Sequence, residues 1–173
     1  MDQRQAADAI KNIETTQQRT QTLRHYRDYG SVIMAWGVAW LVGFMTQQFA
    51  PDAAWLAWGA AWIGALGWTL TRPAGKSDQK ALATWIICNA CISLLLVLIE
   101  ADFRTIAAVF AIGLTAAYAV MGVWAGRRFL ALAALVLVSL LIGWWVVPDA
   151  LFFALALGGG AGLVLGGLWL RQP

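Results

Sequence analysis

Charged residues are scarce in this chain, and their scarcity excludes a water-soluble fold. Only 12% of the 173 residues are Asp, Glu, Lys or Arg, against roughly 25% in an ordinary soluble domain. Hydrophobic residues make up 61% of the chain, and the mean hydropathy is +0.67. A surface this apolar is stable only against lipid, so the sequence predicts an integral membrane protein.

Several kinds of functional residue are also missing. The single histidine, His25, lies outside every apolar run, which excludes a haem held by two histidines in a monomer and a zinc site of three histidines. No phosphate-binding loop, nucleophile elbow or zinc-protease motif is present. No charged residue lies in the middle of an apolar run, which disfavours an ion-coupled pump. We therefore expect no enzymatic activity and no cofactor.

Six apolar runs follow one another along the chain. They lie near 31–49, 53–71, 82–99, 103–125, 129–147 and 150–170. Each is long enough to cross a hydrocarbon core of about 30 Å as a helix. Lipid offers backbone amides no hydrogen-bond partner, so these spans must be helical. The sequence predicts an all-α polytopic protein in which residues 30–173 form six transmembrane helices arranged as three hairpins.

The basic residues predict the orientation of the bundle. Of the 12 Lys and Arg residues, only Arg104 falls in the first, third or fifth connection. Because positive residues remain in the cytoplasm, both termini should be cytoplasmic, and a bacterial inner membrane is the expected location. Basic residues confined to helix ends follow from orientation and do not indicate nucleic acid binding.

A short repeat marks two of the outer turns. The tripeptide Pro-Asp-Ala occurs at 51–53 and at 148–150, and Pro followed by Asp favours the start of a helix. The inward-running helices also end alike, with tryptophan and then arginine. Duplication of one hairpin would explain this likeness, and so would the ordinary aromatic and basic anchors at a membrane interface.

Residues 1–29 precede the first span and form a polar segment with few helix breakers. Acidic residues lie early in it and arginines late, which suits a helix dipole. We predict a cytoplasmic, amphipathic juxtamembrane helix. It would either dock a cytoplasmic protein partner or lie against anionic lipid.

The third span contains both cysteines of the chain, Cys88 and Cys91. A C-x-x-C pair suggests a thiol-redox or Cu(I) site. A disulfide between neighbours on a regular helix is strained, however, and apolar surroundings make thiols inert. We expect structural thiols that pack as small hydrophobes, with a metal or redox role as the weaker alternative.

Asn89 is the one amide buried deep within a predicted span. Helical spacing separates it from the cysteines and places it with Ser93. It would bond across a helix interface, with Ser139 and Thr115 as partners of matching depth, or line a pathway. Glu100, where the third span ends, is a further candidate contact for an ion or substrate.

Two sets of spaced residues predict packing or binding. Trp36 with Trp40, and Trp58 with Trp62, are each four residues apart and form aromatic stripes that either stack a flat ligand or pack against neighbours. The sixth span repeats a small residue every four positions, which lets another helix approach closely. This glycine ridge consists of Ala154, Gly158, Gly162 and Gly166.

These features favour a non-enzymatic membrane protein with a role in interaction, sensing or membrane stress, and a hydrophobic ligand is a candidate for binding. We expect a homo-oligomer formed through the glycine ridge, surrounded by the lipid bilayer. The alternatives are a channel or facilitator for a small neutral or hydrophobic solute, lined by Asn89, Ser93 and the tryptophan stripes, and the thiol-redox or Cu(I) protein.

Overall fold

A computed structural model of the protein describes residues 29–71 and 76–172. This part of the chain is all-helical, with 92% of it in helices and no strand. The predicted helix within residues 1–29 lies almost wholly outside the described residues, as does the inner loop 72–75. The all-α prediction is thus confirmed for the part of the chain that is described.

The helical elements follow the order of the predicted runs. The first helix is Tyr29–Phe49, followed by the 3₁₀ turn η1 (Pro51–Ala53), α2 (Ala54–Leu70) and α3 (Lys76–Leu98). Next come α4 (Phe103–Ala125), α5 (Arg128–Leu141) and its π-helical continuation η2 (Ile142–Val146). The chain continues with η3 (Pro148–Ala150), α6 (Leu151–Ala154), the π-helical η4 (Leu155–Ala161) and α7 (Gly162–Leu170). We call the elements from α5 to α7 the last hairpin.

Four helical segments in the described residues are long and apolar enough to cross a membrane. They are Tyr29–Phe49, Phe103–Trp124, Arg127–Val146 and Pro148–Leu170. The apolar parts of α2 and α3 are shorter than these four segments. α2 has 17 residues, and the apolar part of α3 is Ala83–Leu98. The membrane class follows from these four helices, while six spans in three hairpins remain a prediction.

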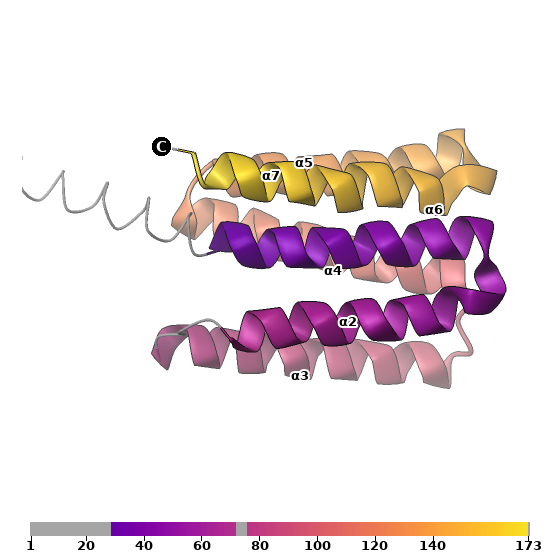
Figure 1. Ribbon diagram of the computed structural model, residues 1–173, viewed down its shortest axis with the longest axis horizontal. Helices are drawn as coiled ribbons and strands as arrows, with labels where there is room; N and C mark the ends of the chain where they lie inside the picture. Colours follow the sequence, from indigo (N-terminus) through magenta and orange to yellow (C-terminus); the bar gives the residue numbers. More distant parts are fainter. Residues whose placement is uncertain (1–28, 72–75, 173) are drawn as a thin grey trace, which may run out of the picture.

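The helices lie side by side along one long axis (Figure 1). In that view α5 and α7 form the upper edge, the Tyr29–Phe49 helix and α4 lie in the middle, and α2 and α3 form the lower edge. The Tyr29–Phe49 helix is central, because its tryptophans contact α2 and α3 while its glycines contact the last hairpin.

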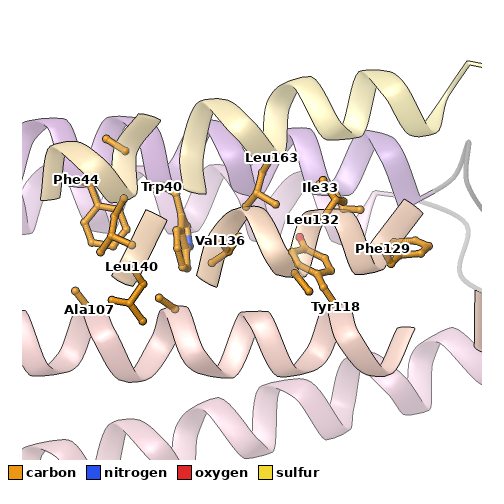
Figure 2. Packing of buried hydrophobic residues seen from close by; sticks show 14 of the residues in the cluster. Ile33, Trp40, Phe44, Ala107, Tyr118, Phe129, Leu132, Val136, Leu140 and Leu163 are labelled. Atoms are coloured by element: carbon orange, nitrogen blue, oxygen red, sulfur yellow. The ribbon is translucent and has the colours of Figure 1, made fainter. Parts of the chain in front are cut away.

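The core is shared unequally among these helices. The main buried cluster consists of residues from the Tyr29–Phe49 helix, α4 and the last hairpin (Figure 2). Phe129, Val136, Leu155 and Leu163 in this cluster are fully buried. Of the buried hydrophobic residues whose burial is described, which leaves out 76–82, only Ala54, Ala65 and Leu96 come from α2 and α3. The α2–α3 hairpin therefore lies against the edge of a core that the other helices build.

Glycines bring the Tyr29–Phe49 helix against the last hairpin. A Cβ added at Gly37 would lie 2.8 Å from the Gly160 carbonyl oxygen, and one added at Gly30 would lie 2.7 Å from the Gly167 carbonyl oxygen. Real Cβ atoms do not approach this closely, so these backbones touch only because side chains are absent.

The ridge of Ala154, Gly158, Gly162 and Gly166 faces a neighbour in the same chain. Cβ atoms added at the three glycines would meet, in order, Ser139, Leu135 and Leu132 of α5. Ala154 lies opposite Gly143 of η2 in the same way. The close neighbour of the ridge is thus the preceding helix, so an oligomer of this chain would need a different surface.

Both Pro-Asp-Ala turns adopt the same local structure. Each forms a single 3₁₀ turn. The residue before each turn has nearly the same backbone conformation, with φ −146° and ψ 65° at Ala50 and φ −131° and ψ 65° at Val147. Gln48 connects the two turns: its Nε2 donates to the Asp149 carbonyl at 2.9 Å, and its Oε1 accepts from the Phe153 amide at 3.3 Å. One amide side chain thus fastens the end of the Tyr29–Phe49 helix to the turn before α6.

Candidate functional site

The two cysteines face outward from α3. Both are free thiols with exposed side chains, and exposed Thr84 and Leu95 lie on the same face. The two thiols share one face of α3, as helical spacing predicts. This face meets no other described helix, so the thiols would contact lipid, and a structural role as small hydrophobes stays a prediction.

Asn89 lies on the inward face of α3, half-buried and in line with Trp85, Ile92 and Leu96. Its Nδ2 donates to the Trp85 carbonyl at 2.8 Å, one turn back in the same helix. Its Oδ1 accepts no hydrogen bond from the described residues. Ser93, one helical turn further along α3, is exposed, whereas Asn89 is half-buried. That the two line a common pathway stays a prediction.

The cross-helix partners expected for Asn89 are occupied or turned elsewhere. The Ser139 hydroxyl donates to the Leu135 carbonyl at 2.7 Å and lies against Gly158. The Thr115 hydroxyl is buried and has no partner among the described residues. Thr115 lies between Ala111 and Tyr118 on the face of α4 that packs on α5. In this structure Asn89 therefore bonds within its own helix and joins no pair of helices.

The two tryptophan stripes divide between two aromatic clusters. Trp36 contacts Trp62 edge-on at 4.8 Å between ring centroids and Trp85 at 5.1 Å, while Trp62 and Trp85 stack at 6.1 Å. We call Trp36, Trp62 and Trp85 the tryptophan triad. It joins the Tyr29–Phe49 helix, α2 and α3, so these side chains pack against one another.

The remaining stripe residues, Trp40 and Trp58, join a phenylalanine cluster. Phe44 lies between them, with ring centroids 5.2 Å from Trp40 and 4.9 Å from Trp58. Phe103 and Phe152 extend the cluster to α4 and α6. The indole of Trp58 covers Gly43, where an added Cβ would lie 2.5 Å from the ring, and its buried Nε1 has no partner among the described residues.

Glu100 ends α3 in a left-handed conformation, with φ 50°. Its amide donates to the Val97 carbonyl, and the Ala101 amide donates to the Leu96 carbonyl, at 3.1 and 3.0 Å. This is the Schellman pattern, whose left-handed position glycine usually occupies. A residue with a Cβ is disfavoured there by roughly 1 kcal/mol. The exposed Glu100 side chain thus belongs to a helix stop, and the candidate contact with an ion or substrate stays a prediction.

Asp102 begins α4 as its N-cap, accepting a hydrogen bond from the Thr105 amide at 3.1 Å. Hydrogen bonds from the side chain and backbone of Thr105, aided by the charge of Arg104, hold the pKa of this carboxyl below its ordinary value of 3.8. Arg104 in turn lies over the Trp144 ring at 5.6 Å. Asp102 therefore caps α4 and Arg104 packs on an aromatic ring at the turn between α3 and α4.

Sequence reasoning missed three residues that organise the bundle. Trp85 completes the tryptophan triad, and its position four residues before Asn89 was an available signal. Gln48 joins the two Pro-Asp-Ala turns. Arg128 at the start of α5 donates to the Trp169 and Gln172 carbonyls at 3.2 and 2.8 Å and lies over the Trp169 ring. The last two depend on contacts between helices that are distant in the sequence, which no local pattern records.

The described residues thus define an all-helical protein with four helices able to cross a membrane. Within residues 29–71 and 76–172 no three His, Cys, Asp or Glu side chains gather into a possible metal site. No family model, curated protein or solved structure matches this chain.

Proposed function

We propose that this chain is a non-enzymatic, six-span inner-membrane protein with both termini in the cytoplasm, and that it acts through contacts with a second copy of itself. The contacts would be made by the outward face of α2 in the α2–α3 hairpin. A role in sensing or membrane stress fits such a protein, with residues 1–29 offered to a cytoplasmic partner.

The glycines of α2 carry this proposal. Cβ atoms added at Gly59, Gly64 and Gly67 would meet nothing within 4 Å. At nearly every other described helical glycine, an added Cβ would lie against atoms of a neighbouring element. Glycine costs a helix about 1 kcal/mol relative to alanine, so it is expected where a close neighbour requires it. A second copy packed on α2 would supply that neighbour. Trp55 and Ile63, both more than 70% exposed, would be covered in the same contact.

The oligomeric state in lipid vesicles tests this proposal. Single-molecule photobleaching should count more than one fluorophore per assembly for the native chain. Gly59→Leu and Gly67→Leu should shift the count to monomers without unfolding the chain, because the added side chains meet open space. Gly113→Leu is the matched control, since Gly113 of α4 is equally open but lies outside the proposed contact. Monomers of the native chain, or equal loss with the control, would refute it.

The position of Asn89 favours a second candidate, a facilitator for a small neutral solute. Its amide oxygen has no partner among residues 29–71 and 76–172 and lies on the inward face of α3, where it could pair with a passing solute. Stopped-flow light scattering of vesicles loaded with glycerol or urea would measure such a flux. Asn89→Leu should reduce the flux while Ser93→Ala, on the exposed side of α3, leaves it unchanged. Flux no faster than in empty vesicles would exclude this candidate.

A further inference from the structure

Two polar atoms near the tryptophan triad lack partners among the described residues. The Trp58 indole N–H is a buried donor, and the Asn89 amide oxygen is an acceptor on a half-buried side chain that keeps some accessible surface. A buried polar group such as the Trp58 N–H costs free energy unless it forms a hydrogen bond, and most native proteins leave few such groups. An unpaired buried donor and an unpaired, partly accessible acceptor thus lie on the neighbouring helices α2 and α3.

The contact between Trp62 and Trp85 fixes the register of α2 against α3. The two helices run in opposite directions (Figure 1), and these rings stack at 6.1 Å. Trp58 comes four residues before Trp62, and Asn89 comes four residues after Trp85. Each step moves about 6 Å along the helix, in the same direction in space. Trp58 and Asn89 therefore lie at the same level along the helix axes. This level is one turn beyond the stacked pair, toward the start of α2 and the end of α3.

Neither side chain is free to turn away. The Trp58 ring is held over Gly43 and between Phe44 and Phe103. The Asn89 amide is oriented by its Nδ2 bond to the Trp85 carbonyl, which leaves Oδ1 as the unpaired end. Their unpaired atoms are therefore held in place by the surrounding packing.

The same chain shows how such a donor is satisfied elsewhere. The Trp36 indole N–H donates to the Thr69 hydroxyl at 3.2 Å, and that hydroxyl donates to the Ala65 carbonyl at 2.8 Å. A hydroxyl can accept from an indole and donate to a carbonyl oxygen at once. Trp58 has an equivalent indole and Asn89 an equivalent oxygen, but no hydroxyl of the described residues bonds to either.

We propose that one neutral hydroxyl group binds between α2 and α3, accepting from the Trp58 indole N–H and donating to the Asn89 amide oxygen. Its source is either water or an alcohol dissolved in the membrane, since both carry the same group. A charged ligand would gain too little here to offset its desolvation. This site is independent of the proposed contact through α2.

Fluorine NMR of the full chain in lipid, labelled with 5-fluorotryptophan, tests the site. The Trp58 resonance is assigned by its loss in Trp58→Phe. The probes are 2-phenylethanol, with ethylbenzene as its hydroxyl-free counterpart, and exchange from H₂O into D₂O. Trp36, whose indole already has Thr69, provides an internal reference that should not move.

A saturable shift of the Trp58 resonance with 2-phenylethanol alone would support an alcohol site. A solvent isotope shift at Trp58 without an alcohol response would support a water site. In either case Asn89→Leu and Asn89→Ala should weaken or remove the response, about fivefold for alcohol affinity, and Ser93→Ala should preserve it. An equal response to ethylbenzene, no response at all, or a response that survives both Asn89 variants would overturn the proposal.

Discussion

The last hairpin and the α2–α3 hairpin are built from similar residues but pack in opposite ways. In the last hairpin, glycines let neighbouring backbones approach closely. Large side chains there, such as Leu155 and Leu163, are fully buried. In α2, three glycines face open space, and Trp55 and Ile63 point outward. Both hairpins are rich in glycine and apolar residues, so composition alone does not separate a helix that packs inside the bundle from one at its edge.

This difference should appear most strongly when glycines are enlarged. Gly37→Leu would drive a side chain into the backbone at Gly160 and should destabilise the fold by about 3 kcal/mol. Gly64→Leu on α2 should change the stability of the separate monomer by less than about 0.5 kcal/mol, because within one chain an added Cβ meets nothing. Reversible unfolding in mixed micelles measures both. Equal losses would mean that α2 is packed as closely as the last hairpin.

Truncating one leucine in each hairpin sharpens the same comparison. Leu163 in α7 is 0% exposed and Leu95 in α3 is 58% exposed. Leu163→Ala should leave a cavity and cost about 2 kcal/mol or more, whereas Leu95→Ala should cost little because lipid takes the place of the side chain. Unfolding under the same conditions compares them directly. A large loss for Leu95→Ala would instead indicate that a second copy covers α3.

The turn that joins α3 to α4 should respond to pH. Because the pKa of Asp102 is lowered, the cap contributes stability that is present above pH 3.8 and is lost as the pH falls through the folded-state pKa. Melting curves between pH 6 and pH 2 should therefore show a decrease that is smaller in Asp102→Asn, which caps without titrating. An identical acid response in the two proteins would contradict the assigned hydrogen bonds.

The smallest effect is expected at the thiols. Replacing Cys88 and Cys91 by alanine should change stability by no more than about 0.5 kcal/mol, because both side chains are exposed on α3. The double variant should also keep the oligomeric state of the native chain. Loss of bound copper or of a redox activity in this variant would revive the thiol alternative.

Much of the local structure could be predicted from particular residues. The apolar runs predicted the helices, and the Pro-Asp-Ala tripeptides predicted where two of them begin. Helical spacing correctly placed Cys88 and Cys91 on one face and Asn89 on another. It did not predict that Ser93 is exposed while Asn89, four residues earlier, is half-buried. It also could not separate Trp36 from Trp40, because residues on one stripe meet different neighbours at different depths.

The sequence by itself determined an all-helical membrane protein, since its scarcity of charge requires lipid and its long apolar runs, which do not alternate with polar residues, can cross lipid only as helices. The tertiary structure decided which neighbour each face meets: α5 for the ridge of Gly158, Gly162 and Gly166, the tryptophan triad for Trp36 and Trp62, and open space for the α2 glycines. The physical reason is that lipid and protein interior are equally apolar. A sequence pattern shows which residues share a helix face, but polarity no longer tells whether that face meets lipid or another helix.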